Sequence, residues 1–128
     1  MDPKLDAFTR AYLETALWAT TDNADESGGE PLDKNYDIYS FTVKSLREAA
    51  RECRDFRAYA AEHISAALAA GADDEQMGHD FFLTRNRHGA GYWDGDYPQA
   101  IGTALTEAAH TFGTAEPYMY RGRLYWHS

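Results

Sequence analysis

The sequence predicts a single α+β domain in which an antiparallel sheet of about four strands packs against three helices, in the order ααββαββ. Three segments repeat apolar residues every three or four positions, as along one face of a helix. Two other segments alternate apolar and polar residues around glycine, as in hairpins. The chain has 128 residues, 44% of them hydrophobic. This is enough for one modest core, so we expect one domain over 1–128.

The three helical segments cover about 3–20, 43–71 and 97–112. In the first, Leu5, Phe8 and Tyr12 begin the apolar stripe. The second is the longest predicted element. The residues expected to cap or end the last two helices are Ser40 or Thr42 and Gly71 for the second, and Asp94 or Asp96, Pro98 and Gly113 for the third.

Two segments are typical of hairpins. In the run "GHDFFLTRNRHGAGYWD" over 78–94, a turn near His88 would place Phe81, Leu83 and Trp93 on the core face. The opposite face would carry Asp80, Phe82, Thr84, Tyr92 and Asp94. The last segment, "EPYMYRGRLYWH", predicts a strand, an Arg121-Gly122 turn and a second strand.

Acidic residues dominate the composition. There are 21 Asp and Glu against 12 Lys and Arg, for a net charge of −9, which disfavours generic nucleic-acid binding. The excess is concentrated in an acidic loop at about 22–38, "DNADESGGEPLDKNYDI", where Lys34 is the one base. This loop is either a solvated connector or an interaction surface.

The second helical segment also carries a basic stripe. Its members are Lys44, Arg47, Arg51, Arg54 and Arg57, with acidic residues interleaved. Two interpretations are open: a solvated face joined by weak ion pairs, or a docking stripe for the acidic loop or for a partner.

Cysteine usage and the chain start indicate a cytoplasmic protein. The lone Cys53 leaves no internal disulfide, and its place on the apolar stripe indicates packing rather than catalysis. The start lacks the pattern of a signal peptide, and no stretch is long and apolar enough for a membrane span. We expect no membrane association.

Neither metal binding nor catalysis has a suitable cluster. His79, Asp80, His88 and Asp94 are possible ligands. However, the two histidines would lie roughly 20 Å apart on an extended strand. Asp80 and Asp94 could act as acid and base only in a pocket that shifts their pKa values. We therefore expect no metal, no cofactor and no catalytic residue.

The first hairpin has two further interpretations. Its aromatic and basic residues could form a base-stacking platform. Alternatively the segment makes the fold, with Asp80 and Asp94 capping or pairing with Arg85 and Arg87. The residues of the platform would be Phe82, Arg85, Asn86, His88 and Tyr92.

The run over 78–94, preceded by "LDKNYDI" and followed by "LTEAAHTFG", resembles a family of small uncharacterised proteins encoded by bacteriophages and prophages. The family pattern is G-H-D-F-aromatic-L-T-R-N-x-H-G-A-G-aromatic-W-D, and the resemblance extends loosely over most of the chain. Here Arg87 fills the variable position, and Gly95 and Asp96 add acidity after the pattern. The resemblance implies a phage genomic setting and a bacterial host cytoplasm, not a mechanism.

These observations together predict an accessory binding protein rather than an enzyme. Its partner would be a host protein or protein–nucleic-acid complex, such as a CRISPR or restriction system, which an acidic surface inhibits by mimicking DNA charge. The acidic residues expected to bind are Asp25, Glu26, Glu30, Asp33, Asp37, Asp94 and Asp96. The alternatives are a nucleic-acid-associated protein that uses the hairpin aromatics and, third, a small hydrolytic enzyme.

Overall fold

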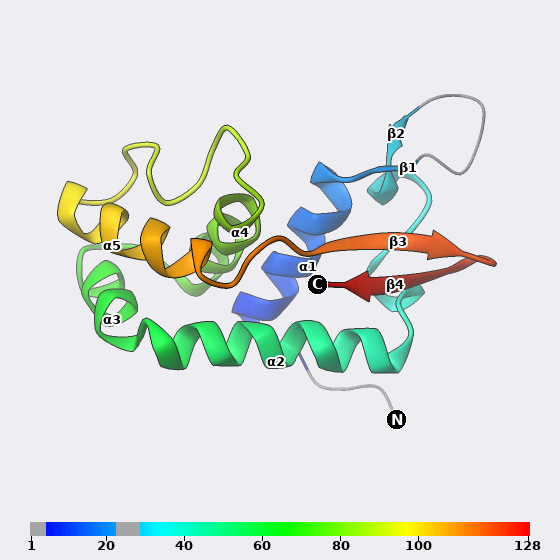
Figure 1. Ribbon diagram of the computed structural model, residues 1–128, viewed down its shortest axis with the longest axis horizontal. Helices are drawn as coiled ribbons and strands as arrows, with labels where there is room; N and C mark the ends of the chain where they lie inside the picture. Colours follow the sequence, from blue (N-terminus) through cyan, green and yellow to red (C-terminus); the bar gives the residue numbers. More distant parts are fainter. Residues whose placement is uncertain (1–4, 23–28) are drawn as a thin grey trace.

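The computed structural model describes residues 5–22 and 29–128, and the fold within these ranges is mainly helical (Figure 1). The elements in chain order are α1 (Ala7–Ala19), β1 (Thr21–Asp22), β2 (Glu30–Pro31), η1 (Leu32–Lys34), η2 (Ile38–Ser40), α2 (Val43–Tyr59), α3 (Ala61–Ala69), α4 (Asp74–Arg85), α5 (Gln99–His110), β3 (Glu116–Tyr120) and β4 (Arg123–His127). The mixed α+β class is as predicted. The four-stranded sheet on three helices is wrong, because the described residues form five α-helices and two separate two-stranded sheets.

Helix α2 runs along the length of the molecule and organises the other elements (Figure 1). The β3–β4 hairpin lies beside its N-terminal half, and α3 and α5 lie near its C-terminal end. Helices α1 and α4 pack against each other in the middle. No helix in the described part of the chain is both long and apolar enough to cross a membrane.

The first and third predicted helices are confirmed as α1 and α5. The second is wrong as a single helix, because the chain turns at Ala60 and continues as α3. Thr42 caps α2 by accepting a hydrogen bond from the Ser45 amide at 3.1 Å. Gly71 follows α3 with a φ of 111°. The acidic cap expected for α5 is absent, since Pro98 precedes that helix without a side-chain cap.

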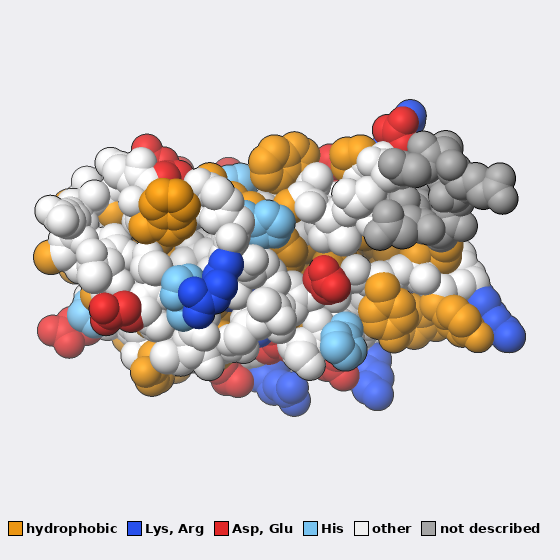
Figure 2. All heavy atoms as spheres, turned by 45° about the horizontal axis from the view of Figure 1, so that its top comes forward, with side chains coloured by type: hydrophobic (Ala, Val, Ile, Leu, Met, Phe, Trp, Pro, Cys, Tyr) orange, Lys and Arg blue, Asp and Glu red, His pale blue; other side chains and the backbone are white. Residues whose placement is uncertain are grey.

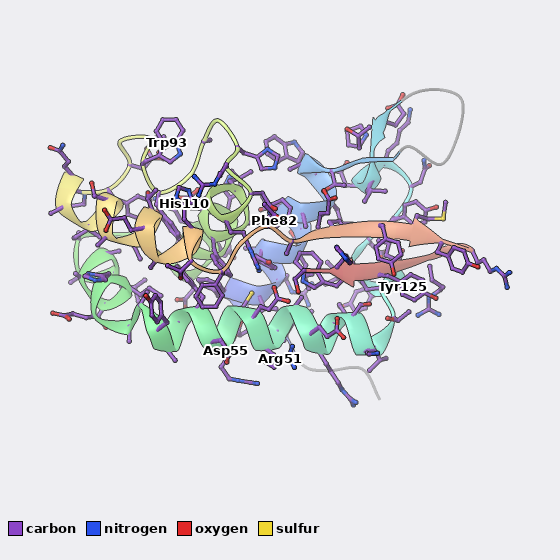
Figure 3. All side chains as sticks on the ribbon, viewed as in Figure 1. Arg51, Asp55, Phe82, Trp93, His110 and Tyr125 are labelled. Atoms are coloured by element: carbon purple, nitrogen blue, oxygen red, sulfur yellow. The ribbon has the colours of Figure 1, made fainter. Side chains whose placement is uncertain are left out.

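The predicted hairpin over 78–94 is also wrong. Its first half belongs to α4, which begins after Asp73, whose side chain accepts from the Gln76 amide at 2.8 Å. Residues 80–85 are all buried, so the C-terminal half of α4 is enclosed and has no polar face to reveal its helical period. The two hairpin faces do not exist: Phe82 and Tyr92 are buried, whereas Trp93, assigned to the core, is 54% exposed (Figure 3).

The C-terminal hairpin forms as predicted. Arg121 and Gly122 turn the chain with φ of 50° and 80°, and Tyr118 pairs directly with Tyr125 across the strands. Leu124 and Trp126 point to the core. The opposite face of this two-stranded sheet is the more exposed one.

A buried ion pair between Arg85 of α4 and Glu52 of α2 lies at the centre of the core. The Arg85 guanidinium also donates to the Tyr12 hydroxyl at 2.9 Å and to the carbonyl oxygens of Phe112 and Gly113 at 2.9 and 2.8 Å. The second Glu52 oxygen accepts from the Trp126 indole at 3.2 Å. These bonds tie α1, α2, α4, the end of α5 and β4 to one another.

Replacing Arg85 with methionine should therefore destabilise the fold strongly. Arg85→Met fills similar space but leaves the Glu52 carboxylate buried without its cation, which costs about 3 to 5 kcal/mol. Urea unfolding followed by tryptophan fluorescence measures this loss.

The matched control is Lys34→Met, which breaks the exposed pair with Glu30 at 3.2 Å. Exposed pairs contribute about 0 to 1 kcal/mol. Equal unfolding midpoints for the two variants would contradict a central role for Arg85.

Candidate functional site

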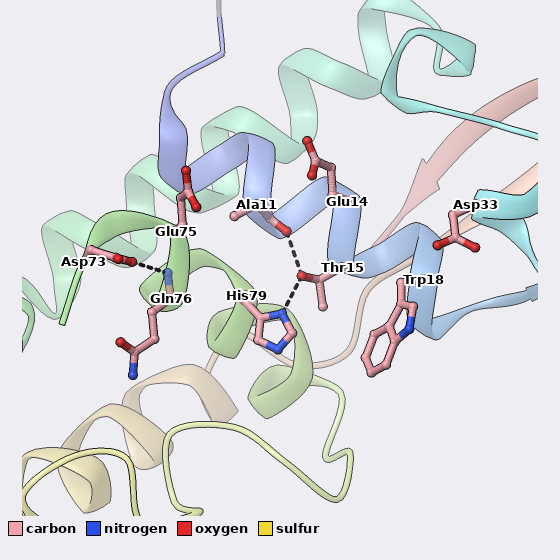
Figure 4. Close-up of a pocket in the computed structure, with 9 residues that line it drawn as sticks. All are labelled: Ala11, Glu14, Thr15, Trp18, Asp33, Asp73, Glu75, Gln76 and His79. Carbon is pink, nitrogen blue, oxygen red and sulfur yellow. Dashed lines mark hydrogen bonds between the residues drawn. The ribbon is translucent and has the colours of Figure 1, made fainter.

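The close packing of α1 on α4 creates a groove on the molecular surface. Gly78 permits this packing, because a Cβ atom at that position would overlap the carbonyl oxygen of Phe8. The exposed edges of the two helices leave an open groove between them, of about 510 Å³ (Figure 4). Its lining residues are Ala11, Glu14, Thr15, Trp18, Asp33, Asp73, Glu75, Gln76 and His79.

His79 is held in this groove by Thr15. The Thr15 hydroxyl donates to the carbonyl oxygen of Ala11 at 2.7 Å and lies 2.9 Å from Nδ1 of His79. A hydroxyl carries one proton. When that proton is given to Ala11, Nδ1 of His79 must be the donor to Thr15, and Nε2 of a neutral ring is left as an acceptor.

Trp18 supplies the apolar surface of the groove. Its side chain is 58% exposed, and its ring lies 6.2 Å from the His79 ring between centroids. Figure 4 shows both rings beside the α1–α4 contact. A large exposed indole next to a hydrogen-bonded imidazole is a preformed contact surface for a ligand.

Four carboxylates give the groove a negative charge. Glu14, Asp33, Asp73 and Glu75 are all exposed, and the lining includes neither lysine nor arginine. One oxygen of Asp73 caps α4. The described residues place no salt-bridge partner within 4.0 Å of the other three carboxylates.

The structure brings only one of the predicted acidic residues into this groove, Asp33. Asp25 and Glu26 lie outside the described residues. Glu30 pairs with Lys34, and Asp37 caps η2 by accepting from the Tyr39 amide at 2.9 Å.

Asp94 and Asp96 lie in the loop before α5, away from the lining of the groove. Asp94 accepts from the Gly91 amide at 3.3 Å within its own turn. The predicted acidic residues thus form no single surface among those that are described.

The residues predicted as a stacking platform mostly build the fold. Phe82 and Arg85 are buried, and Tyr92 is buried with its hydroxyl donating to the carbonyl oxygen of Met77 at 2.6 Å. Asn86 ends α4, and its side chain accepts from the Ala115 amide at 2.9 Å. Only His88 is exposed, and its ring lies 6.0 Å from that of Phe82 between centroids.

The interpretation in which Asp80 caps the backbone or pairs with Arg85 or Arg87 is wrong. Asp80 instead accepts from the Tyr97 hydroxyl at 2.7 Å, while Arg85 binds Glu52. Burial raises the pKa of the Asp80 carboxyl above its ordinary value, although the bond from Tyr97 acts in the opposite direction. Cys53 is buried as predicted, and burial raises the pKa of its thiol far above the ordinary value.

Among residues 5–22 and 29–128 no group of three or more His, Cys, Asp or Glu side chains is arranged to hold a metal ion. Comparison of the chain with protein-family models, with curated proteins and with solved structures finds no match.

Most of the groove was missed by sequence reasoning. Glu14 and Trp18 are one helical turn apart on α1, outside the apolar stripe, so their spacing was an available signal. No such signal marked Asp73, Glu75 and Gln76, because α4, the helix that positions them, was not predicted.

Asp80→Asn should make stability less sensitive to pH. The folded protein holds the Asp80 proton to higher pH than the unfolded chain does, whose carboxyl keeps a pKa near 3.8. Wild-type stability therefore falls as pH rises from that value through the raised pKa. Asparagine still accepts from Tyr97 and has no proton to lose, so the variant gains stability relative to wild type as pH rises above about 3.8 and through the raised pKa of Asp80.

Chemical denaturation at several pH values measures the difference in free energy of unfolding. Glu62→Gln, at an exposed carboxyl of α3, controls for the loss of one negative charge. A wild-type to Asp80→Asn difference that stays constant over this range would contradict the raised pKa.

Proposed function

We propose that this protein is a binding protein whose α1–α4 groove accepts a positively charged segment of a partner protein. The supporting observation is the combination of four exposed carboxylates, the exposed Trp18 and the absence of lysine and arginine from the groove lining. Carboxylates attract Lys and Arg side chains, and the indole face binds the same cations through its π electrons. The Nε2 atom of a neutral His79 adds an acceptor for a guanidinium or ammonium donor.

The form of the groove suits a peptide better than a small-molecule substrate. It is open rather than enclosed, and its acidic groups come from α1, η1 and the start of α4. An extended or helical basic segment can reach all three elements at once, whereas a small cation can contact only part of them.

The groove gives the hypothesis of an accessory binder with an acidic surface a specific location on the molecule. A basic segment from the nucleic-acid-binding cleft of a host defence complex has the positive charge that would complement the carboxylates of the groove. Asp33 joins the acidic loop to the groove. Inhibition of such a complex by a phage protein remains our hypothesis about the partner.

Calorimetric titration with a short oligoarginine peptide tests the groove. We expect Glu14→Gln with Glu75→Gln to weaken binding about tenfold, since each exposed charge contributes up to about 1 kcal/mol. Trp18→Ala should weaken it several-fold through loss of the cation–π contact, worth about 0.5 to 1 kcal/mol at an exposed site. Added salt should reduce the effect of the charge variants more than that of Trp18→Ala.

Glu62→Gln with Glu107→Gln is the matched control, because it removes two exposed carboxylates elsewhere. If this control weakens binding as much as the groove variant does, the peptide responds to net charge alone and the proposed groove is wrong.

A further inference from the structure

A second surface lies on the outer face of the C-terminal hairpin. The cross-strand pairs Glu116 with His127, Tyr118 with Tyr125, and Tyr120 with Arg123 alternate with the core-facing pairs, so their side chains share one face. Tyr118 and Tyr120 are 48% and 53% exposed. In Figure 2, hydrophobic and basic side chains gather at the end of the molecule where the hairpin lies.

The tyrosines of this face form a connected cluster. The rings of Tyr118 and Tyr125 stack with centroids 5.4 Å apart, and Tyr120 meets Tyr125 edge-on at 6.3 Å. The guanidinium of Arg121 lies over the Tyr120 ring at 5.2 Å. An exposed stack of this kind is rigid and presents aromatic faces to a planar ligand.

Helix α2 continues the surface with a row of basic residues. Lys44, Arg47, Arg51 and Arg54 are exposed, and their spacing places them within an arc of about 80° around the helix. None of the four has a salt bridge within 4.0 Å to a described residue. The interpretation of the basic stripe as a face joined by ion pairs is therefore wrong for these four residues. Of the five residues of the stripe, only Arg57 forms a salt bridge to a described residue, Asp6, at 2.7 Å.

The two parts are joined by shared residues. One hollow is lined by Lys44 and Glu48 of α2 together with Tyr118 and Tyr125 of the hairpin. A second hollow is lined by the same Lys44 and Glu48 and by Arg47, Arg51 and Arg54. Figure 3 shows Arg51 on the outer side of α2 and Tyr125 on the hairpin beside this helix.

We propose that this tyrosine–arginine surface, the outer hairpin face with the basic row of α2, binds single-stranded nucleic acid. Unpaired bases stack on the tyrosines, and phosphates lie against the basic side chains. The bases of a duplex are already stacked on one another and cannot meet the tyrosine faces. The inference concerns a different surface from the acidic groove and does not rest on it.

The net charge of −9 does not oppose this proposal, because charge is segregated. The surface holds six of the twelve basic residues of the chain, Lys44, Arg47, Arg51, Arg54, Arg121 and Arg123. Three acidic residues, Glu48, Asp55 and Glu116, lie among or beside them, which leaves a local excess of three positive charges. Phosphate is attracted by this local field at distances below about 10 Å, where salt screens it only in part.

Fluorescence anisotropy with a labelled oligothymidine of about 12 nucleotides tests the surface. We expect saturable binding that is stronger than binding to a duplex of the same length. Tyr118→Ala with Tyr125→Ala should weaken it at least about fivefold, and Tyr120→Ala alone should weaken it as well. Arg47→Gln with Arg51→Gln should weaken it and lower the slope of log affinity against log salt by about 1.4, or about 0.7 for each phosphate contact.

The controls remove similar groups elsewhere. Trp93→Ala with Tyr59→Ala deletes two exposed aromatic side chains, and Lys34→Gln with Arg87→Gln deletes two exposed basic ones. Both controls should retain wild-type affinity, and thermal melting checks that every variant is folded.

Three results would overturn the proposal. The first is absence of saturable binding at about 50 mM salt. The second is an unchanged affinity in both tyrosine variants, which assigns the surface to polyanions in general. The third is salt-sensitive self-association that Arg47→Gln with Arg51→Gln abolishes and the oligonucleotide does not displace, which assigns the surface to a second copy of this chain.

Discussion

The buried pair of Arg85 and Glu52 is the constraint on which the rest of the fold depends. A charged guanidinium is stable inside a protein only if its donors are satisfied, and here α1, α2 and the segment that follows α5 supply the partners. Tyr12 must therefore face Arg85 from α1, and Glu52 must face it from α2. The same requirement places the C-terminal half of α4 in the middle, where residues 80–85 are buried. The aromatic core then packs around this network, with the rings of Phe56 and Phe81 stacked at 4.0 Å between centroids.

Elements with one buried face could be predicted from the sequence, whereas enclosed ones could not. Helices α1 and α5 and the C-terminal hairpin each have a polar side, so their apolar residues recur with the period of the element. The C-terminal half of α4 is buried on all sides and contains Phe81, Phe82 and Thr84, which favour strands. Its tertiary contacts override that preference. Arginine is usually exposed, so no local pattern marks Arg85 as part of the core.

The segment 78–94 is rich in polar residues and so resembles a functional site. Many of these residues are instead hydrogen-bond partners for polar groups that the fold buries. Thr84 accepts from the Tyr92 amide at 3.0 Å, and Gly91 has no side chain because a Cβ atom there would meet the Thr84 hydroxyl. Asp80 bonds to Tyr97, and Asn86 to Ala115. The density of such residues thus reflects the needs of the fold around α4. The exposed residues of the groove and of the tyrosine–arginine surface are ones that the core does not require. Sequence patterns indicated the basic stripe and the C-terminal hairpin separately, but not that the fold places them side by side.

The two surfaces differ in charge, and the average over the chain hides both. Glu14 and Glu75 face a groove without lysine or arginine, while Arg47 and Arg51 stand on a helix face without described ion-pair partners. Like charges gathered on one face repel each other, and folding tolerates this because the side chains remain solvated. Each surface includes regular elements that the Arg85–Glu52 network joins, α1 and α4 for the groove and α2 and β4 for the tyrosine–arginine surface. Arg85 joins α1 to α2 from within the core. A substitution at one exposed surface therefore leaves the contacts of the other surface in place. Binding at the unaltered surface then shows that a variant of the other surface is folded.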